Sequence, residues 1–258
     1  MKALEKKLTD KIKQDKSVEI LSVSSWCFPI QTIEFKYKPV KRFTMDILMK
    51  MVLLSCQQAE IAEPKELSDL LLVEELFIRD LLQNLQKTGL VEKEEYYQLT
   101  ERGKKQLENG IFEEAQEEEI QELLYSSNHK AFLVGDIEQL DDFDEFPEAF
   151  AYASEEPIAI ENEVIIQALQ ENRPVSEDEE SSENTVQTFI TSIESIETVQ
   201  INDIPCMQFI LYNKEKDLLY VRVWNTLTGF WDESLEKLLT EKELLNWREK
   251  YLDRIGNL

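Results

Sequence analysis

The chain contains a single histidine, His129, and this limits the chemistry that its side chains can perform. A paired histidine site for acid and base catalysis, or a histidine-rich metal centre, needs at least a second imidazole. His129 stands beside Lys130 in a polar stretch, which is typical of a solvent-exposed side chain. The sequence therefore predicts a lone surface histidine and no histidine-based active site.

The glycines exclude two common phosphate-binding motifs. All six are isolated from one another, whereas a phosphate-cradling loop and a dinucleotide fingerprint both need clustered glycines. Nucleotide-dependent enzymes of those kinds are thereby excluded. The three cysteines, Cys27, Cys56 and Cys206, are scattered and include no Cys-x-x-Cys pair. This usage fits a reducing compartment and argues against a structural zinc site.

Two patterns of charged residues resemble metal-binding motifs, but each lacks residues that the motif requires. Glu34 and Lys36 have the Glu-x-Lys spacing that puts both side chains on one face of a strand, as metal-dependent nucleases require. No aspartate lies on a plausible neighbouring strand, and so short a pattern is common by chance. The acids between 141 and 145 have the composition of a calcium site but lack its glycine and its twelfth-position glutamate. We therefore expect no metal site, no cofactor and no enzymatic activity.

The strongest pattern of helix and strand signals in the sequence lies in residues 42–110. Thr44 can cap a helix whose apolar residues, at positions 47, 48, 51, 52 and 54, predict one buried face. Pro64 fits the first turn of a second helix that ends at Leu71. A third helix is expected from about Glu74 to Thr88, and the isolated Gly89 ends it. Two short strands over 90–93 and 96–99 and a final helix beginning near 100 complete the predicted order.

The residues after this third helix carry a resemblance. Gly89-Leu90-Val91, followed by Tyr97-Gln98-Leu99-Thr100-Glu101-Arg102-Gly103, resembles the winged helix-turn-helix domains of bacterial MarR-type and PadR-type transcription regulators. The resemblance covers about seventy residues and implies a winged helix over 42–110. It also implies DNA binding, although winged helices serve as protein-docking modules as well.

The remaining sequence predicts further parts of an α+β protein. Residues 1–41 read as an N-terminal helix and two strands, 18–23 and 30–37, joined through Phe28-Pro29. Residues 111–175 are expected to form an acidic, mainly helical segment with helices over 111–124 and around 164–169. Residues 176–185 have the composition of a flexible linker. Residues 186–258 predict a small antiparallel α+β domain of four strands and two closing helices, capped by Asp232 and Thr240.

Charge is concentrated in one part of the chain. The net charge is −25, and residues 111–183 contain 23 acidic and two basic residues. Such a segment repels phosphate backbones and attracts basic partners, while the alternative is a solvated surface that keeps the protein soluble. No apolar run approaches the roughly 18 residues of a membrane span, and the N-terminus lacks a secretory core. We therefore expect a cytoplasmic protein without a membrane partner.

The third helix is the one that would read DNA in a winged helix. Its inward positions are Ile78, Leu82 and Leu85 by the helical repeat. The residues left for its outer face are Glu74, Glu75, Leu76, Phe77, Arg79, Asp80, Gln83, Asn84 and Lys87. This face has three acids and two bases, and the wing tip over 92–95 is also net negative. The usual DNA surface therefore lacks the positive charge that supplies most sequence-independent affinity.

Three functional hypotheses follow. The leading one is a non-enzymatic winged-helix adaptor or regulatory subunit of a DNA-handling or transcription assembly, which binds a basic protein partner or a nucleic-acid complex. Its expected partner-binding residues are Glu74, Glu75, Leu76, Phe77, Arg79 and Asp80. The alternative is a sequence-specific transcription regulator whose DNA-binding residues would be Lys36, Lys38, Lys41, Arg42, Arg79, Gln83, Asn84 and Lys87. The least favoured is a metal-dependent nuclease.

In the leading hypothesis, Leu76 and Phe77 form the apolar centre of the docking site and the charged residues form its rim. The competing interpretation is that Phe77 folds back against residues 1–41, since singly exposed apolar residues are ordinary.

Overall fold

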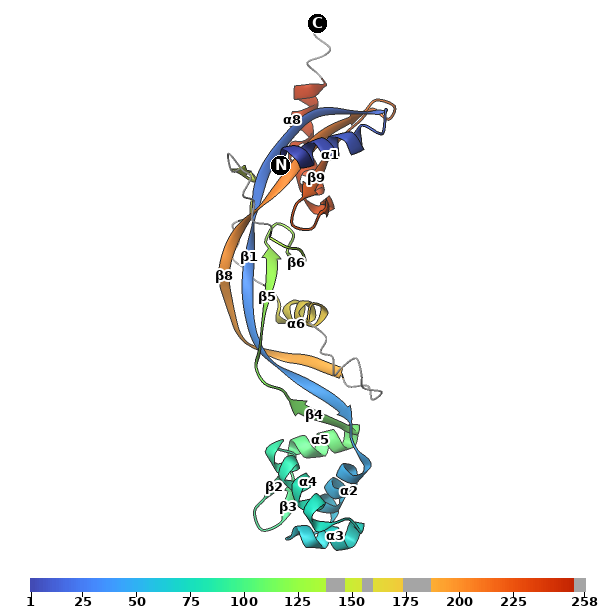
Figure 1. The fold of residues 1–258 in the computed structure, drawn as a ribbon, viewed down its shortest axis with the longest axis vertical. Helices are drawn as coiled ribbons and strands as arrows, with labels where there is room; N and C mark the ends of the chain where they lie inside the picture. The colour runs from blue at the N-terminus through green and yellow to red at the C-terminus, as the bar shows by residue number, and fades with distance from the viewer. Residues whose placement is uncertain (138–146, 155–159, 174–186, 253–258) are drawn as a thin grey trace. The chain divides into compact units, whose positions relative to one another are not determined.

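The computed structural model describes residues 1–137, 147–154, 160–173 and 187–252, and it has the expected α+β class (Figure 1). The chain forms two compact units. The first unit combines Met1–Phe35, Glu122–Ile160 and Ile196–Leu258, and the second combines Lys36–Gln121 and Glu161–Ser195. The acids expected at 141–145 and the expected linker at 176–185 lie outside the described residues.

The helices are α1 (Lys2–Ile12), α2 (Ile47–Gln58), α3 (Pro64–Leu71), α4 (Glu75–Lys87), α5 (Glu101–Asn109), α6 (Asn162–Glu171) and α8 (Glu233–Tyr251). The strands are β1 (Val18–Thr44), β2 (Val91–Lys93), β3 (Tyr97–Leu99), β4 (Ile111–Ala115), β5 (Glu119–Ser126), β6 (Ala131–Leu133), β7 (Glu148–Ala149), β8 (Gln187–Asn213), β9 (Leu218–Asn225) and β10 (Phe230–Trp231). Strands β1 and β8 are each 27 residues long and contribute to both units.

In the second unit, α2, α3, α4, the β2–β3 hairpin and α5 follow in the order that the sequence predicts. The inward positions expected on α4, namely Ile78, Leu82 and Leu85, are buried. They belong to one core with side chains from α2, α3, the hairpin and α5. These amphipathic elements can be recognised locally because each presents one apolar face to that core.

The buried face expected on α2 is wrong in part. Ile47 is 75% exposed and Met51 46% exposed, whereas Val52, Leu53 and Cys56 are buried. The reason is that almost every side chain in the first two turns of α2 is apolar, so periodicity alone does not define the inward face. The cap also differs from expectation, because the Asp46 carboxylate accepts the Leu48 N–H at 2.8 Å.

Helix α5 closely approaches the chain at Leu90, just before the β2–β3 hairpin. The Thr100 hydroxyl donates to the Gly89 carbonyl at 2.7 Å and accepts the Gly103 N–H at 3.0 Å, which caps α5. A Cβ atom on Gly103 would lie 2.1 Å from the Leu90 carbonyl oxygen. Only glycine therefore fits at position 103 without moving the backbone.

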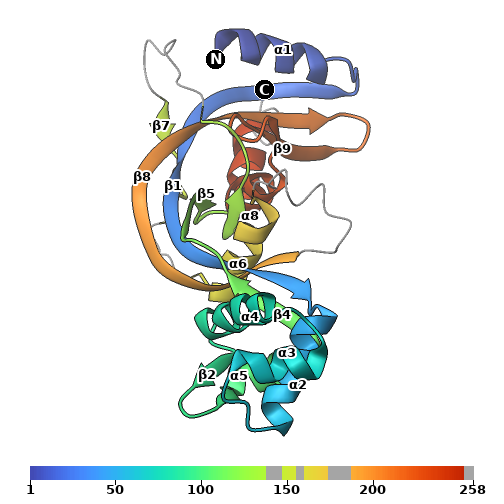
Figure 2. The same cartoon turned by 60° about the horizontal axis from the view of Figure 1, so that its bottom comes forward.

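In the first unit, an antiparallel sheet is the main element, as predicted for the C-terminal part of the chain. β8 pairs with β9 from Cys206↔Asn225 to Asn213↔Leu218, and β9 pairs in turn with β10. Helix α8 packs against β9. Helix α1 lies beside the sheet near the chain start (Figure 2), where Leu8 packs against Met207, Phe209 and Leu211 of β8.

The two long strands correct several expectations. The strands expected at 18–23 and 30–37 are one strand, β1, which continues through Pro29. The pairing of β1 with β7 ends at Cys27, two residues before Pro29. A proline is tolerated in a strand at a position where no neighbouring strand needs a hydrogen bond from its N–H. The first three strands expected after the linker are likewise parts of β8. The residues between the expected strands therefore do not end them, and β1 and β8 are neighbours in one sheet.

The helix expected over 111–124 is wrong, because this segment forms β4 and β5. β4 pairs antiparallel with the end of β1, from Val40↔Ala115 to Thr44↔Ile111. Further along, the predicted helix around 164–169 is confirmed as α6. The two closing helices are a single helix, α8. Asp232 caps it as expected, whereas the Thr240 hydroxyl donates to the Glu236 carbonyl within the helix and caps nothing.

We expect Gly103→Ala to destabilise the second unit by about 1 to 3 kcal/mol or more, because the new methyl group must displace the Leu90 backbone. Chemical unfolding followed by helical circular dichroism measures this loss. Lys105→Ala, at an exposed position of the same helix, is the control and should change stability little. Equal stability of the two variants would contradict the close approach of α5 to Leu90.

Candidate functional site

Four exposed apolar residues of the second unit lie where α3 turns into α4. We define the α3–α4 corner as Leu70 on α3, Leu72 in the turn, and Leu76 and Phe77 in the first turn of α4. Their exposed fractions are 60%, 91%, 60% and 59%, in that order. Phe77 therefore does not fold back against residues 1–41. Isolated exposed leucines are ordinary, but four such residues on one helix–turn–helix corner are typical of an interaction surface.

The backbone of the turn presents Leu72 to solvent. Leu72 has φ 55° and ψ 40°, a left-handed conformation that costs a leucine roughly 1 to 2 kcal/mol. Two hydrogen bonds hold this turn, because the Val73 N–H donates to the Ser68 carbonyl at 3.3 Å and the Ser68 hydroxyl donates to the Val73 carbonyl at 2.7 Å. A strained backbone that exposes an apolar side chain points to a functional role for the turn.

Acidic residues surround the corner. Asp69, Glu74 and Asp80 are exposed, and no ion pair joins them to a base in the described part of the chain. Arg79 pairs with Glu75 one turn earlier on α4, at 2.6 Å, so its charge is compensated within the helix. The six partner-binding residues that the sequence predicts are therefore brought together on the first turns of α4, with an apolar centre and a net negative rim.

Three of the six bases expected to contact DNA, Lys38, Arg42 and Arg79, form ion pairs with carboxylates of the same unit. Lys38 contacts Glu194 at 2.7 Å, and this hydrogen bond raises the pKa of the Lys38 ammonium. Arg42 contacts Glu113 at 2.8 Å, and its guanidinium lies 4.3 Å from the Phe189 ring centroid.

The other expected DNA contacts lie on two elements. Lys41 stands opposite Glu114 in the register of β1 and β4, and Lys36 is half-buried on β1. Gln83, Asn84 and Lys87 are exposed along α4. The polar side chains of α4 are thus exposed, whereas Lys38, Arg42 and Lys41 face acidic residues of the acidic segment or of β8.

Other acids of this segment are also used internally. The Tyr37 hydroxyl donates to Gln121 at 2.8 Å and to Glu119 at 3.2 Å, and Arg173 pairs with Glu119 at 3.1 Å. Burial and the neighbouring Glu119 raise the pKa of Tyr37 to about 12. These contacts join the residues that follow α6 to β5 and β1 within the second unit.

The expectation that His129 is a surface residue is wrong. Its side chain is 7% exposed and forms two hydrogen-bonding contacts, from Nδ1 to the Ser126 hydroxyl at 2.7 Å and from Nε2 to Asp232 at 2.9 Å. Asn225 also donates to Asp232, at 2.8 Å, and the Leu235 N–H donates to it at 3.1 Å. The cluster therefore connects the β5–β6 turn to the beginning of α8 within the first unit.

These residue types resemble a catalytic triad, but their arrangement does not support nucleophilic catalysis. A catalytic serine must meet a substrate, and Ser126 is fully buried. Burial raises the pKa of Asp232. The hydrogen bonds from His129, Asn225 and Leu235, together with the nearby His129 charge, lower this pKa by more than burial raises it, so the net shift is downward. Asp232 therefore acts as an ionised cap for α8 and as a partner that orients His129. Sequence spacing could not reveal this pair, because 103 positions separate the two residues.

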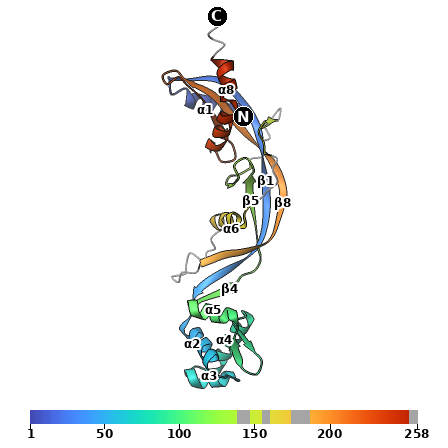
Figure 3. The ribbon, with the colours of Figure 1, turned by 180° about the vertical axis from the view of Figure 1, so that it is seen from behind.

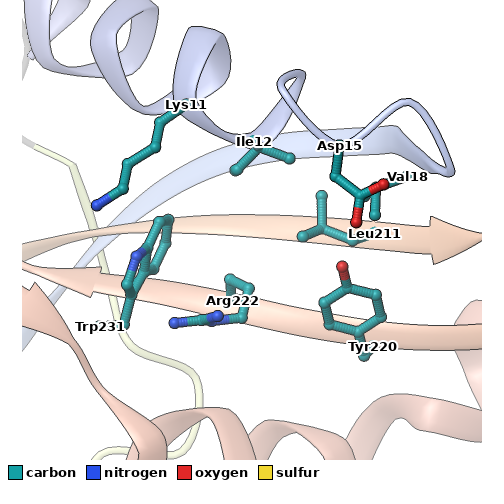
Figure 4. A pocket seen from close by; sticks show the side chains of 8 residues that line it. All are labelled: Lys11, Ile12, Asp15, Val18, Leu211, Tyr220, Arg222 and Trp231. Carbon is teal, nitrogen blue, oxygen red and sulfur yellow. The ribbon is translucent and has the colours of Figure 1, made fainter.

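A small open pocket of about 220 Å³ lies between α1 and the sheet of the first unit (Figure 4). Its lining residues are Lys11, Ile12, Asp15, Val18, Leu211, Tyr220, Arg222 and Trp231. Arg222 lies 4.5 Å from the Trp231 ring centroid and donates to Glu236 at 2.8 Å. Because its charge is already paired and the lining includes no nucleophile with an adjacent base, the pocket has no catalytic arrangement.

The described residues hold no group of three His, Cys, Asp or Glu side chains that could bind a metal ion. Glu34 and Lys36 lie two residues apart on β1, and both are half-buried. None of the helices in the described ranges is long and apolar enough to cross a membrane. Comparisons with protein-family models, with curated proteins and with solved structures gave no match.

We expect Asp232→Asn to lower the free energy of unfolding by about 1 to 3 kcal/mol at neutral pH, because the variant loses the charged partner of His129. All four tryptophans lie in the first unit, so their fluorescence reports its unfolding. Because the pKa of Asp232 is lowered by folding, the difference between wild type and variant should be complete above about pH 4, the pKa of an unfolded aspartate, and should shrink as pH falls through the folded value. Asp10→Asn, on the exposed side of α1, is the control. A difference that grows towards low pH would contradict an ionised Asp232.

Proposed function

We propose that this protein is a non-enzymatic adaptor or regulatory subunit of a DNA-handling or transcription assembly, and that α2 to α5 with the β2–β3 hairpin act as a winged helix that docks a protein partner. The order of these elements and the close packing of Gly103 on Leu90 support the winged-helix interpretation. The α3–α4 corner carries the proposal, because Leu70, Leu72, Leu76 and Phe77 are all more than half exposed.

The charges around α4 favour a protein over DNA at this surface. A DNA-reading helix presents its first turns to the major groove, between two phosphate backbones. Here Glu74 and Glu75 occupy that end of α4, and Asp80 follows one turn later. The hairpin adds exposed Glu92, Glu94 and Glu95. Glu75 is paired with Arg79, but phosphates would meet repulsion at the other acids, whereas an apolar protein groove would bury the corner.

The same charges define the partner's chemistry. A groove that accepts three leucines and a phenylalanine, bordered by lysine or arginine, would match both the apolar centre and the acidic rim of the corner. The net charge of −25 would add long-range attraction to a basic partner and would speed association at low ionic strength. Basic proteins that themselves bind nucleic acid meet this description, which is why we place the protein in such an assembly.

A direct DNA-binding regulator remains the second candidate, and one observation favours it. Gln83, Asn84 and Lys87 are exposed along one side of α4, and side chains of these types can contact base edges or phosphates. The engaged states of Lys38 and Arg42 in the second unit count against it.

The docking hypothesis predicts that Leu76→Ala with Phe77→Ala leaves the fold intact and abolishes partner capture. Both side chains are largely exposed, so their loss should change thermal stability little, whereas truncating an aromatic anchor at an interface costs about 2 kcal/mol or more of binding free energy. Immobilised full-length protein is incubated with extract of the native cell, and captured proteins are quantified by mass spectrometry.

The matched control for this experiment is Ile47→Ala with Met51→Ala, a pair of exposed apolar residues on α2. It should retain the captured protein. Loss of capture in both double variants, or in neither, would place the partner-binding surface elsewhere. A large drop in melting temperature for the α4 variant would instead mean that Leu76 and Phe77 stabilise the fold.

The DNA-binding alternative makes a different prediction, measured with fluorescent duplex DNA of random sequence. A direct DNA binder should bind at low salt and lose affinity steeply as salt rises, because counterions are released from the phosphates. Our proposal predicts that the duplex DNA does not show salt-dependent binding to the isolated protein. Steep salt dependence that Lys87→Ala and Asn84→Ala weaken would favour the DNA-binding regulator.

A further inference from the structure

Strand β8 has a neighbour on only one side over part of its length in the first unit. β1 lies along one side of it, since Asn202 of β8 donates to Thr32 of β1 at 3.4 Å and Trp26 of β1 donates to Gln208 of β8 at 2.8 Å. β9 lies along the other side but pairs only with Cys206–Asn213. Figures 1 and 3 show β8 running beside β1. No described strand pairs with the second side of β8 from Ile196 to Ile204, and we call this stretch the β8 edge.

The pairing with β9 stops at Pro205 for a local reason. The Pro205 carbonyl accepts hydrogen bonds from the Thr226 N–H at 3.3 Å and from its hydroxyl at 2.8 Å. Pro205 has no N–H to donate in return. The chain beyond Thr226 turns towards β10 and α8, so β9 does not continue along the β8 edge.

The side chains of the β8 edge are unusual for an unprotected strand. Ile196 is 48% exposed, Val199 55% and Ile201 63%. Natural sheets shield their edges with lysine, proline or a bulge, because unpaired N–H and C=O groups bind other strands. Residues 196 to 204 include neither lysine nor proline. The stretch therefore combines free backbone groups with exposed β-branched side chains.

Charge on the β8 edge specifies the partner further. Val199 and Ile201 lie two positions apart and so share one face of the strand. Glu197 and Asp203 lie on the same face, one on each side of this pair. Both acids are exposed, and no ion pair engages either among the described residues. The face thus has an acid, two apolar residues and an acid at every second position.

We propose that the β8 edge binds an extended segment of a partner protein as an added strand, with apolar side chains opposite Val199 and Ile201 and lysine or arginine opposite Glu197 and Asp203. Main-chain hydrogen bonds to the edge hold the segment, and the alternating side chains select it. This surface belongs to the first unit and is separate from the α3–α4 corner of the second, so it adds an interaction to the proposed function.

A second copy of the chain fits this edge poorly. Two β8 edges could pair antiparallel around a twofold axis at Gln200, which would place Val199 opposite Ile201 of the other copy. The same register places Glu197 opposite Asp203, and like charges directly opposite each other destabilise a strand pair. A parallel, in-register pair would place each acid opposite itself. The net charge of −25 adds further repulsion between copies. The chemistry therefore favours a different chain with basic residues.

The test uses full-length protein and a fluorescent synthetic peptide, acetyl-Lys-Thr-Val-Thr-Val-Thr-Lys-amide, as the probe. We expect saturable binding by fluorescence anisotropy, and slower hydrogen exchange of the amides in 196–204 when the peptide is bound. A peptide of the same sequence with N-methylated backbone amides should not bind, because it cannot donate to the edge. Equal binding of the methylated peptide, or protection confined to other segments, would overturn the proposal.

Two pairs of substitutions separate strand pairing from simple charge attraction. Val199→Lys with Ile201→Lys should weaken peptide binding about tenfold or more, because it removes two cross-strand contacts and adds repulsion. Leu218→Lys with Leu245→Lys adds the same charge at exposed positions of the first unit and should keep binding within about twofold. Equal weakening by both pairs would reduce the interaction to net charge and overturn the proposal.

Two further results address the alternatives. Sedimentation of the free protein should show a monomer across the concentration range used, and a dimer that Val199→Lys with Ile201→Lys abolishes would show that the edge binds a second copy instead. The Leu76→Ala, Phe77→Ala variant should bind the peptide as the wild type does. Peptide binding that survives in that variant while partner capture is lost shows that the two surfaces act separately.

Discussion

The structure depends on the pairing of two 27-residue strands, β1 and β8, within one sheet. Every N–H and C=O group inside a folded protein needs a partner, and an interior strand needs one on each side along its length. β1 has β8 on one side and β4, β5 and β7 at successive positions on the other. Because β1 is interior, three consecutive residues, Trp26, Cys27 and Phe28, are buried in the first unit. This pairing joins the first forty residues to the last third of the chain.

The β8 edge of the first unit follows from the need of each strand for a pairing partner along its length. β1 and β8 are of equal length, whereas β9 has only eight residues. A short third strand beside a long second one leaves part of the second strand unpaired. The β8 edge is therefore a consequence of strand lengths and of Pro205, and the side chains at Val199 and Ile201 decide what such an edge can bind.

The sequence predicts the α2 to α5 region well because its determinants are local. Amphipathic spacing around Leu82, the turn at Gly89 and the cap at Thr100 each act within a few residues. The long strands could not be predicted in the same way, because their partners are distant: Arg42 stands opposite Glu113, and Asn202 contacts Thr32. The acidic run after Ile111 favours a helix by composition, but pairing with β1 overrides that preference.

The exposure of Leu76 and Phe77 could be predicted because it too depends on local spacing. Leu76 and Phe77 lie outside the inward set of α4, so helical periodicity alone exposes them. Leu70 and Leu72 join them only because the turn takes a left-handed conformation, which the sequence does not indicate for a leucine. The burial of His129 also depends on a tertiary contact, with Asp232, and no local pattern signals it.

The distribution of ion pairs in the second unit gives the acidic residues two roles. Glu113 and Glu194 engage Arg42 and Lys38, so the bases most suited to phosphate contact are already satisfied. Phosphate binding would have to break these contacts and also overcome the uncompensated acids at the start of α4. The α3–α4 corner itself is an apolar surface bordered by the exposed acids Asp69, Glu74 and Asp80. Each of these two ion pairs removes one base and one acid together, so the negative charge that remains near α4 comes from acids without such a partner among the described residues, Asp69, Glu74 and Asp80.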